Sequence, residues 1–223
     1  MSSLTDSGFR AVCLSIEARA DRRGPIQEDF GRYGISVEFF RAGPDGDDLD
    51  RKDTEPPPRI GYPAWVRRPN SWNAFCCFLQ IIQKAKKEGV QNLLILEDDA
   101  FTTEDFLHVY LKARQDVEQA DPDWQMLYLG ANHTFARTEM VTRNLLRLNG
   151  SGCWHAVLLN RRAFDPVLNL PQTGPIDGVV GREMHPRGHC YAVWPNIVLT
   201  RPGYSYCEGR DVNYDEFWSN RGC

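Results

Sequence analysis

The feature that most constrains the fold is a short apolar run followed directly by three acids. Residues 93–96 read LLIL, and Glu97, Asp98 and Asp99 come next. Such a run is typical of a central strand buried on both faces of a sheet. Because carboxylates resist that burial, the strand must end abruptly in polar space. The sequence therefore predicts an α/β fold with this strand near its centre and a ligand edge at the strand's carboxyl end.

Strand and helix patterns alternate before this run. Residues 10–16 and 35–42 predict two strands, and the segment between them predicts a helix with Pro25 in its first turn and Gly34 as its stop. A strand, a helix and a strand in this order imply a parallel pair joined by a right-handed crossover.

Later segments continue the same pattern. Apolar residues spaced by three and four predict one helix that Ser71 caps and Gly89 ends, and another that starts at Thr102 in a capping-box arrangement. Residues 125–130 and 154–160 predict two more strands. From there on, repeated prolines predict loops and short strands.

The 223 residues predict a single domain over residues 1–223. Within it, residues 43–63 are rich in Gly, Pro and acid, which indicates a mobile surface loop. Residues 207–223 form a tail that we expect to pack Phe217 and Trp218 on the core.

Composition excludes several classes of protein. The net charge of -4 argues against broad binding to nucleic acid or to an anionic membrane. No apolar run approaches the roughly 20 residues that cross a bilayer, and the first 23 residues lack the pattern of a secretory signal. Seven cysteines, with Cys76 and Cys77 adjacent, indicate mostly buried thiols in a reducing compartment, so we expect a cytoplasmic protein.

The three acids at the strand end repel one another unless a cation or basic groups neutralise them. Mg²⁺ or Mn²⁺ suits such a site, because each takes oxygen ligands and leaves positions for phosphate oxygens. The acids can also be a surface cluster that favours the next helix N-terminus. Three arginines follow the first strand, Arg19, Arg22 and Arg23. They can bind phosphate or carboxylate at the same edge of the sheet, or they can be solvent-exposed residues at the start of a helix. Neither GxGxxG nor GxxxxGK[ST] is present.

The order of these pieces resembles glycosyltransferase family 25 of lipooligosaccharide biosynthesis. The resemblance covers about residues 10–206 and rests on the segments CLSIEARADRR, GISVEFFRA, LLILEDDAF, LYLG, WHAVLLN and VWPNIVLTRPGYS. It implies a GT-A-like, Rossmann-type sandwich with a mostly parallel central sheet and helices on both faces. It also implies a UDP-sugar donor and a divalent metal, Mn²⁺ or Mg²⁺.

The resemblance also assigns site residues. Asp99 matches the family's acidic motif as the first choice for metal contact, with Asp98 beside it, while Glu97 and Asp98 lie in the donor site. Arg19, Arg22 and Arg23 fall in the stretch expected to contact the donor. On the helix before the acidic strand, Cys77 and Phe78 occupy positions where family members commonly carry a Ser-His pair.

An inverting transfer needs a base that takes the proton from the acceptor hydroxyl. Asp177 is the candidate, because it matches a family aspartate and lies in the predicted loop TGPIDGVVG, although an Asp-Gly pair can also be a simple turn. His189 is a candidate third metal ligand, since imidazole tolerates Mn²⁺ better than Mg²⁺. His185, His189 and Cys190 lack the second ligand pair of a structural zinc site. His155 lies within a predicted strand and fits a core or pocket-wall residue.

The sequence thus predicts a metal-dependent inverting glycosyltransferase of glycan biosynthesis. It would move a hexose, galactose or glucose, from a UDP-sugar to a glycan or to a lipid-linked or protein-linked saccharide, with no nucleic-acid partner and no membrane-spanning segment. A catalytically silent GT-A-like module that binds glycan or protein is the alternative, and a metal-dependent phosphohydrolase that uses the same acids is a third reading.

Overall fold

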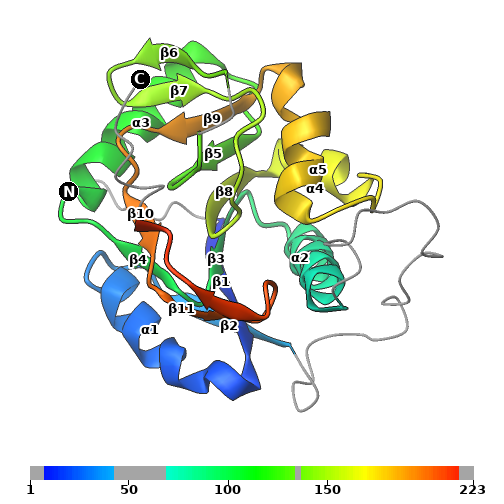
Figure 1. Cartoon of the computed structure of the whole chain (residues 1–223). Coiled ribbons are helices and arrows are strands. Elements are labelled where there is room, and N and C mark those ends of the chain that lie inside the picture. The colour runs from blue at the N-terminus through cyan, green and yellow to red at the C-terminus, as the bar shows by residue number, and fades with distance from the viewer. Residues whose placement is uncertain (1–7, 43–68, 134–136, 216–223) are drawn as a thin grey trace.

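The computed structural model describes residues 8–42, 69–133 and 137–215 (Figure 1). In this part of the chain the main sheet has eight strands in the order β2-β1-β3-β8-β5-β9-β7-β6. The strands are β1 (Phe9–Ile16), β2 (Val37–Ala42), β3 (Asn92–Glu97), β5 (Met126–Tyr128), β6 (Glu139–Thr142), β7 (Leu145–Arg147), β8 (Ala156–Asn160) and β9 (Cys190–Val193).

The predicted α/β class is confirmed, and the sheet is mixed where the sequence predicted mostly parallel strands. β1 runs parallel to β2 and to β3, and β5 runs parallel to β9. The pairs β3 with β8, β5 with β8, β7 with β9 and β6 with β7 are antiparallel. The chain enters β8 at the edge where β3 ends, so β8 must run back between β3 and β5.

Strand β3 is buried on both faces, as its apolar run predicts. Leu93 and Ile95 pack into the core on one side of the sheet, and Leu94 and Leu96 pack into the core on the other. This alternation follows from the two-residue period of a strand. Glu97 is the first residue of the strand that is not fully buried.

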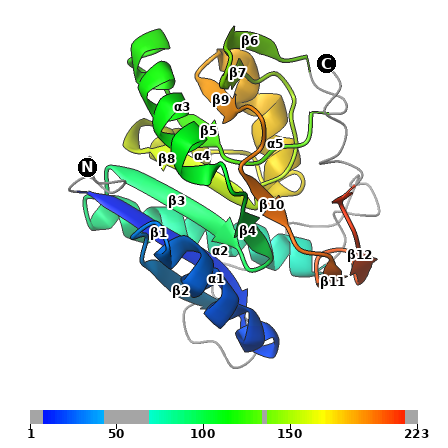
Figure 2. The same ribbon diagram turned by 90° about the vertical axis from the view of Figure 1, so that its left-hand side faces the viewer.

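Helices cover both faces of the sheet, as predicted (Figure 2). On one face lie α1 (Arg23–Gly31) and α3 (Phe106–Ala120), which contribute Phe30 and Phe106 to the core. On the other lie α2 (Pro69–Lys87), α4 (Phe164–Leu168) and α5 (Ile176–Glu183). Cys77 and Phe78 are 1% exposed on α2 and belong to that second core.

Two predicted helix starts are wrong. Helix α2 already begins at Pro69, so Ser71 lies within it. The next helix begins at Phe106 and not at the predicted Thr102. Thr102 is instead the last residue of the short strand β4 (Ala100–Thr102), which pairs with β10 (Val198–Thr200). The buried Asp29 carboxylate holds residue 102 in this position by accepting a hydrogen bond of 2.6 Å from its backbone N–H.

The region after residue 160 is more helical than predicted. It contains the expected short strands, including the hairpin of β11 (Gly203–Ser205) and β12 (Arg210–Val212), but also α4 and α5. Pro166 lies in the first turn of α4, and Pro175 is the residue before α5. Both positions tolerate proline, since the N–H groups there have no partner within the helix.

Some predictions fall outside the described residues. These are the loop at 43–63 and the packing of Phe217 and Trp218, whereas residues 207–215 of the predicted tail are described. No described helix has the length and apolar character needed to cross a bilayer. The described cysteines form no disulfide; Cys13, Cys76, Cys77 and Cys190 are buried, Cys153 is half-buried and Cys207 is exposed. The division into one domain stays a prediction.

Candidate active site

The three acids lie in the tight turn from β3 to β4, at the carboxyl end of the buried strand. The backbone holds them on two sides. The Glu97 N–H donates to the His155 carbonyl at 2.9 Å, and the Arg201 N–H donates to the Asp99 carbonyl at 2.8 Å. The Arg201 guanidinium donates to the Ala100 carbonyl at 2.7 Å. The acids are therefore fixed between β8 and the segment that follows β10.

Arg22 is the arginine that meets the acids. It ends the 3₁₀ helix η1 (Glu17–Arg22), which follows β1, and its Nη1 lies 2.7 Å from Asp98 Oδ1 and 4.0 Å from Asp99 Oδ2. These side chains are only 14%, 18% and 19% exposed. An ion pair with so little exposure is screened less by solvent than a surface pair.

The other two arginines have different partners. Arg19 Nη1 donates to the Tyr204 carbonyl at 3.4 Å. Arg23 donates to Ser15 Oγ at 2.9 Å and to Glu17 Oε2 at 2.7 Å, so it braces the start of α1 against β1. The structure thus brings Arg22 to the acids, while Arg19 contacts the C-terminal hairpin and Arg23 has internal partners.

Burial and mutual repulsion make these carboxyl groups easier to protonate. Desolvation raises the pKa of Glu97 well above its usual range, and the charges of Asp99, Asp177 and Asp98 raise it further. Desolvation also raises the pKa of Asp98 against the opposing effect of Arg22. The pKa of Asp99 rises to about 6, first through desolvation and then through the charge of Asp98.

Asp177 lies in the first turn of α5, where the sequence predicted a loop. Its Oδ1 accepts from the Gly178 N–H at 2.8 Å, and its Oδ2 accepts from the Cys153 N–H at 3.3 Å. Cys153 has a φ of 76° and so turns the loop before β8 toward Asp177. Desolvation and the charge of Asp99 raise the pKa of Glu97, and the charge of Asp177 adds to them, so Asp177 lies within electrostatic range of the acids.

The prediction of His189 as a metal ligand beside Asp98 and Asp99 is wrong. His189 precedes β9, whose first residue pairs with Met126 at the start of β5. Because β5 pairs with β8 and β8 pairs with β3, His189 is level with the amino end of β3. The acids lie at the other end of β3, a strand length of roughly 16 Å away. His189 Nδ1 instead lies 2.8 Å from Asp121 Oδ2, which makes it part of a different cluster.

Three further histidines are internal. Desolvation lowers the pKa of His133, His155 and His185 to about 4. His155 Nε2 lies 3.0 Å from the Val198 carbonyl, so it carries the proton and donates. His185 Nδ1 accepts from the Gly150 N–H at 3.3 Å, which leaves Nε2–H to face the Tyr128 hydroxyl at 3.1 Å. These bonds make His155 and His185 structural residues.

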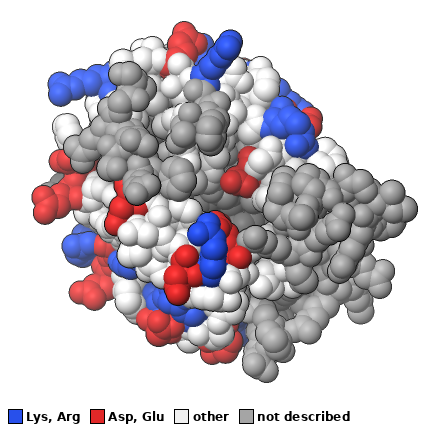
Figure 3. All heavy atoms as spheres, viewed as in Figure 1, with Lys and Arg blue, Asp and Glu red and all other residues white. Residues whose placement is uncertain are grey.

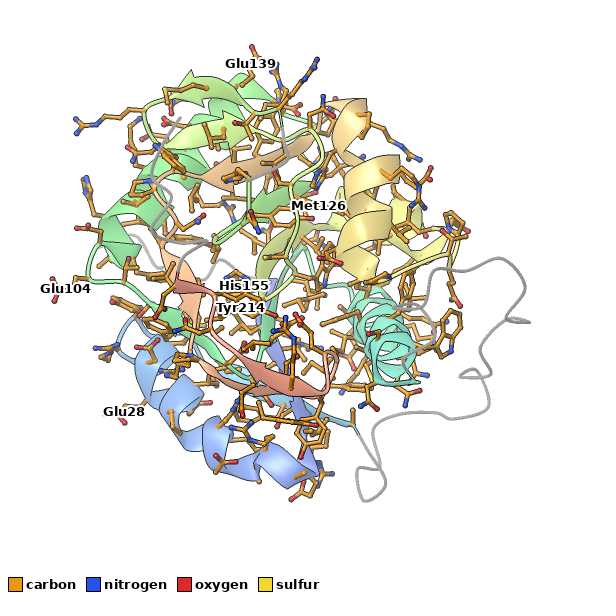
Figure 4. The ribbon with its side chains drawn as sticks, in the orientation of Figure 1. Glu28, Glu104, Met126, Glu139, His155 and Tyr214 are labelled. Atoms are coloured by element: carbon orange, nitrogen blue, oxygen red, sulfur yellow. The ribbon has the colours of Figure 1, made fainter. Side chains whose placement is uncertain are left out.

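The hairpin β11–β12 completes the edge and was not predicted as part of the site. Figures 1 and 2 show it at the end of the sheet where β3 finishes. The Tyr204 carbonyl accepts from Arg19 at 3.4 Å, and a Cβ added at Gly203 would lie 3.0 Å from Arg22 Nη2, so the hairpin lies against η1 beside the acids. Tyr214, labelled with His155 in Figure 4, has a pKa raised by burial, then by Glu208, and further by Cys153 and Glu97. The sequence signal for this hairpin was the segment GYSY at residues 203–206, which is too short for the alternation of apolar and polar residues to predict a strand.

The residues at this edge fit a divalent cation that also binds a phosphate ligand. Asp99 Oδ1 is a buried acceptor with no hydrogen-bond partner in the part of the chain that the structure describes. Mg²⁺ and Mn²⁺ often use one or two carboxylates and complete their shell with phosphate and water. In the described ranges no three His, Cys, Asp or Glu side chains gather into a protein-only metal cage, so such a cation would depend on Asp99, on Asp98 and on the ligand.

The surface around the site carries both signs of charge. Figure 3 shows Lys and Arg interspersed with Asp and Glu over the described part of this face, without a continuous basic field. The described structure thus places a group of partly buried acids, paired with Arg22, at the carboxyl end of β3 in an α/β sheet. The carboxyl edge of the strands is where α/β proteins of this class usually bind ligands.

The comparisons with known proteins give the family. A family model described as glycosyltransferase family 25 (LPS biosynthesis protein) matches residues 11–149. The match spans more than half of the chain, and the protein therefore belongs to glycosyltransferase family 25. It includes the arginines and the acids and ends before Asp177. Comparison with curated proteins gives no match.

Three solved structures show the range of similarity. A glycosyltransferase involved in the glycosylation of the major capsid of PBCV-1 is 14% identical, with 89% of this chain and 96% of that chain covered and a TM-score of 0.43. A197 from STIV is 12% identical, with 91% and 93% covered and a TM-score of 0.42. Mannose-1-phosphate geranyltransferase from Thermus thermophilus is 14% identical, with 84% and 74% covered and a TM-score of 0.38.

Proposed function

We propose that this glycosyltransferase moves a hexose, galactose or glucose, from a UDP-sugar to a glycan or to a lipid-linked or protein-linked saccharide, with inversion at the anomeric carbon. The observation that carries the proposal is the Asp99 carboxylate at the carboxyl end of β3, with its Oδ1 buried and without a hydrogen-bond partner among the described residues. A buried charged oxygen without a partner costs several kcal/mol, by a rough estimate, unless a ligand supplies one.

The donor would bind between η1 and the acids. Arg22 can interact with either a carboxylate or a diphosphate, since its fork of N–H donors fits both. Asp99, with Asp98 beside it, would hold Mn²⁺ or Mg²⁺. When bound, such a cation offsets the negative charge that builds on the leaving diphosphate.

Asp177 would act on the acceptor. Its two backbone hydrogen bonds, from Gly178 and Cys153, hold the carboxylate in one orientation. A base oriented in this way can take the proton from an acceptor hydroxyl as that oxygen attacks the sugar. The neighbouring Glu97 has a raised pKa, so its neutral form avoids a second negative charge beside Asp177. We also propose a reducing compartment, because Cys13, Cys77 and Cys190 are buried and form no disulfide.

Isothermal titration with UDP, with and without Mn²⁺, tests the proposal. We expect UDP to bind more tightly with Mn²⁺, and we expect Asp99→Asn to remove that difference because it removes one ligand charge. Asp165→Asn is the matched control, since Asp165 is 65% exposed and pairs with Lys86 on the surface. If UDP binds the native protein in neither condition, the proposal is wrong.

The alternative function is a catalytically silent module that binds glycan or protein. It is favoured by the ion pair of Arg22 with Asp98, which already neutralises one acid without a ligand. Transfer or hydrolysis of a UDP-sugar that disappears in Asp99→Asn marks the enzyme. Glycan or protein binding that is unchanged in that variant, with neither reaction detectable in the native protein, marks the module.

A further inference from the structure

Two tyrosines on the C-terminal hairpin form an exposed aromatic corner. Tyr204 lies within β11 and Tyr206 follows its last residue, so the two-residue period of a strand puts both rings on one face. Their ring centroids are 5.2 Å apart and their planes meet at 85°. The residues are 44% and 40% exposed, whereas large apolar side chains elsewhere in the described chain are mostly buried.

The backbone of the hairpin fixes this corner at the edge of the proposed site. The Tyr204 carbonyl accepts from Arg19, and the Tyr206 carbonyl accepts from Asn70 Nδ2 at 2.8 Å. A Cβ added at Gly203 would lie 3.0 Å from Arg22 Nη2, the arginine that pairs with Asp98. The hairpin therefore spans from η1 to the start of α2, beside the acids.

The shape of the corner favours a sugar ring over a nucleobase. A planar base stacks well on a ring parallel to it and gains little from a second ring at 85°. A pyranose chair has C–H groups on its face and around its rim, so it can contact both walls at once. The acids beside the corner suit hydroxyl groups, which donate hydrogen bonds to carboxylates.

We propose that Tyr204 and Tyr206 bind the pyranose ring of a neutral saccharide acceptor at the rim of the site. This inference rests on the proposed transferase function and names the class of acceptor that the function leaves open. The tyrosine pair would hold the acceptor ring by apolar contact, while Asp177 faces the hydroxyl that reacts.

Saturation-transfer NMR with methyl β-galactopyranoside, methyl β-glucopyranoside and UDP as separate probes tests this inference. We expect the native protein to bind at least one glycoside. Tyr204→Ala with Tyr206→Ala should weaken that glycoside about tenfold or more, the effect of losing an aromatic anchor. The UDP signal should not change. Tyr204→Phe with Tyr206→Phe keeps both rings and should retain the glycoside.

The matched control is Leu107→Ala with Leu111→Ala, an apolar pair on α3 that is 41% and 38% exposed. It should leave all signals unchanged, and thermal unfolding of each variant checks the fold. The inference is overturned if the native protein binds neither glycoside or if the double alanine variant keeps the glycoside. It is also overturned if that variant loses UDP, which would make the corner a nucleobase site. Failure of UDP to bind the native protein refutes the transferase proposal alone.

Discussion

Replacing Gly130 with alanine should destabilise the protein strongly, because no space exists there for a methyl group. Gly130 follows β5, and a Cβ built on it would lie 2.0 Å from the Val198 carbonyl oxygen and 2.5 Å from His155 Nε2. Carbon and oxygen normally approach no closer than about 3.3 Å. The crowded oxygen belongs to β10, whose neighbour Arg201 binds the backbone of Asp99.

The magnitude follows from two effects. Forcing β10 outward by more than 1 Å or so is overpacking, which costs about 1–3 kcal/mol. The same movement breaks the hydrogen bond from His155 to Val198, and the buried groups left without partners cost about 1–3 kcal/mol more. We therefore expect the free energy of unfolding to fall by about 4 kcal/mol, which is roughly 8–16 °C in Tm for a chain of this size.

Thermal and urea unfolding followed by circular dichroism measure this loss. Gly31→Ala is the matched control, since Gly31 ends α1 and a Cβ there meets nothing within 4 Å. It should leave Tm unchanged or slightly raised, because alanine favours a helix over glycine. A Gly130→Ala protein as stable as the control would refute the packing argument.

Three further predictions concern charge. His155 and His185 are buried with pKa values of about 4, so between pH 6.5 and 4 the unfolded chain binds more protons at these two residues than the folded one. Each histidine should therefore lower the free energy of unfolding by about 2 kcal/mol at pH 5, while the raised pKa values of Asp99 and Glu97 act in the opposite direction over the same range. A His185→Gln protein whose free energy of unfolding changes from pH 7 to 5 as that of the native protein does would contradict this. Asp177→Asn should lower kcat for transfer about 10²–10⁴-fold and leave the Kd for UDP unchanged, with full activity as the opposing result. Arg22→Ala should destabilise by about 1–3 kcal/mol, since it removes the partner of Asp98; urea unfolding measures the loss, and an unchanged midpoint counts against the pair.

The local features of the fold could be predicted from the sequence. The run at 93–96 is buried on both faces because four adjacent apolar residues can satisfy no other environment. The helix between the first two strands could be predicted from Pro25 near its start and Gly34 after its end. Gly34 has a φ of 75°, a conformation that favours glycine. Signals of this kind lie within a few residues of the element that they define.

Features that depend on strand order could not be predicted in this way. His189 lies at the amino end of the sheet because β9 pairs in parallel with β5, and nothing near His189 reports that pairing. Strands β6 and β7 are short, and β6 lies at the edge of the sheet, so the apolar pattern of residues 139–147 is weak. Arg22 and Arg23 are adjacent in sequence, and only the turn of η1 decides which of them reaches the acids.

The place of β8 in the sheet affects how the chain can fold during synthesis. β8 lies between β3 and β5, yet it is made after β3, β5, β6 and β7. A nascent chain that has emerged only to residue 149 lacks both neighbours of β5, which are β8 and β9, and leaves the apolar β3 with an unpaired edge. An edge of this kind promotes aggregation. A fragment limited to residues 11–149, the span of the family match, would expose that edge permanently. Residues 156–160 are therefore needed to join β3 to β5, and β9 is needed to join β5 to β7.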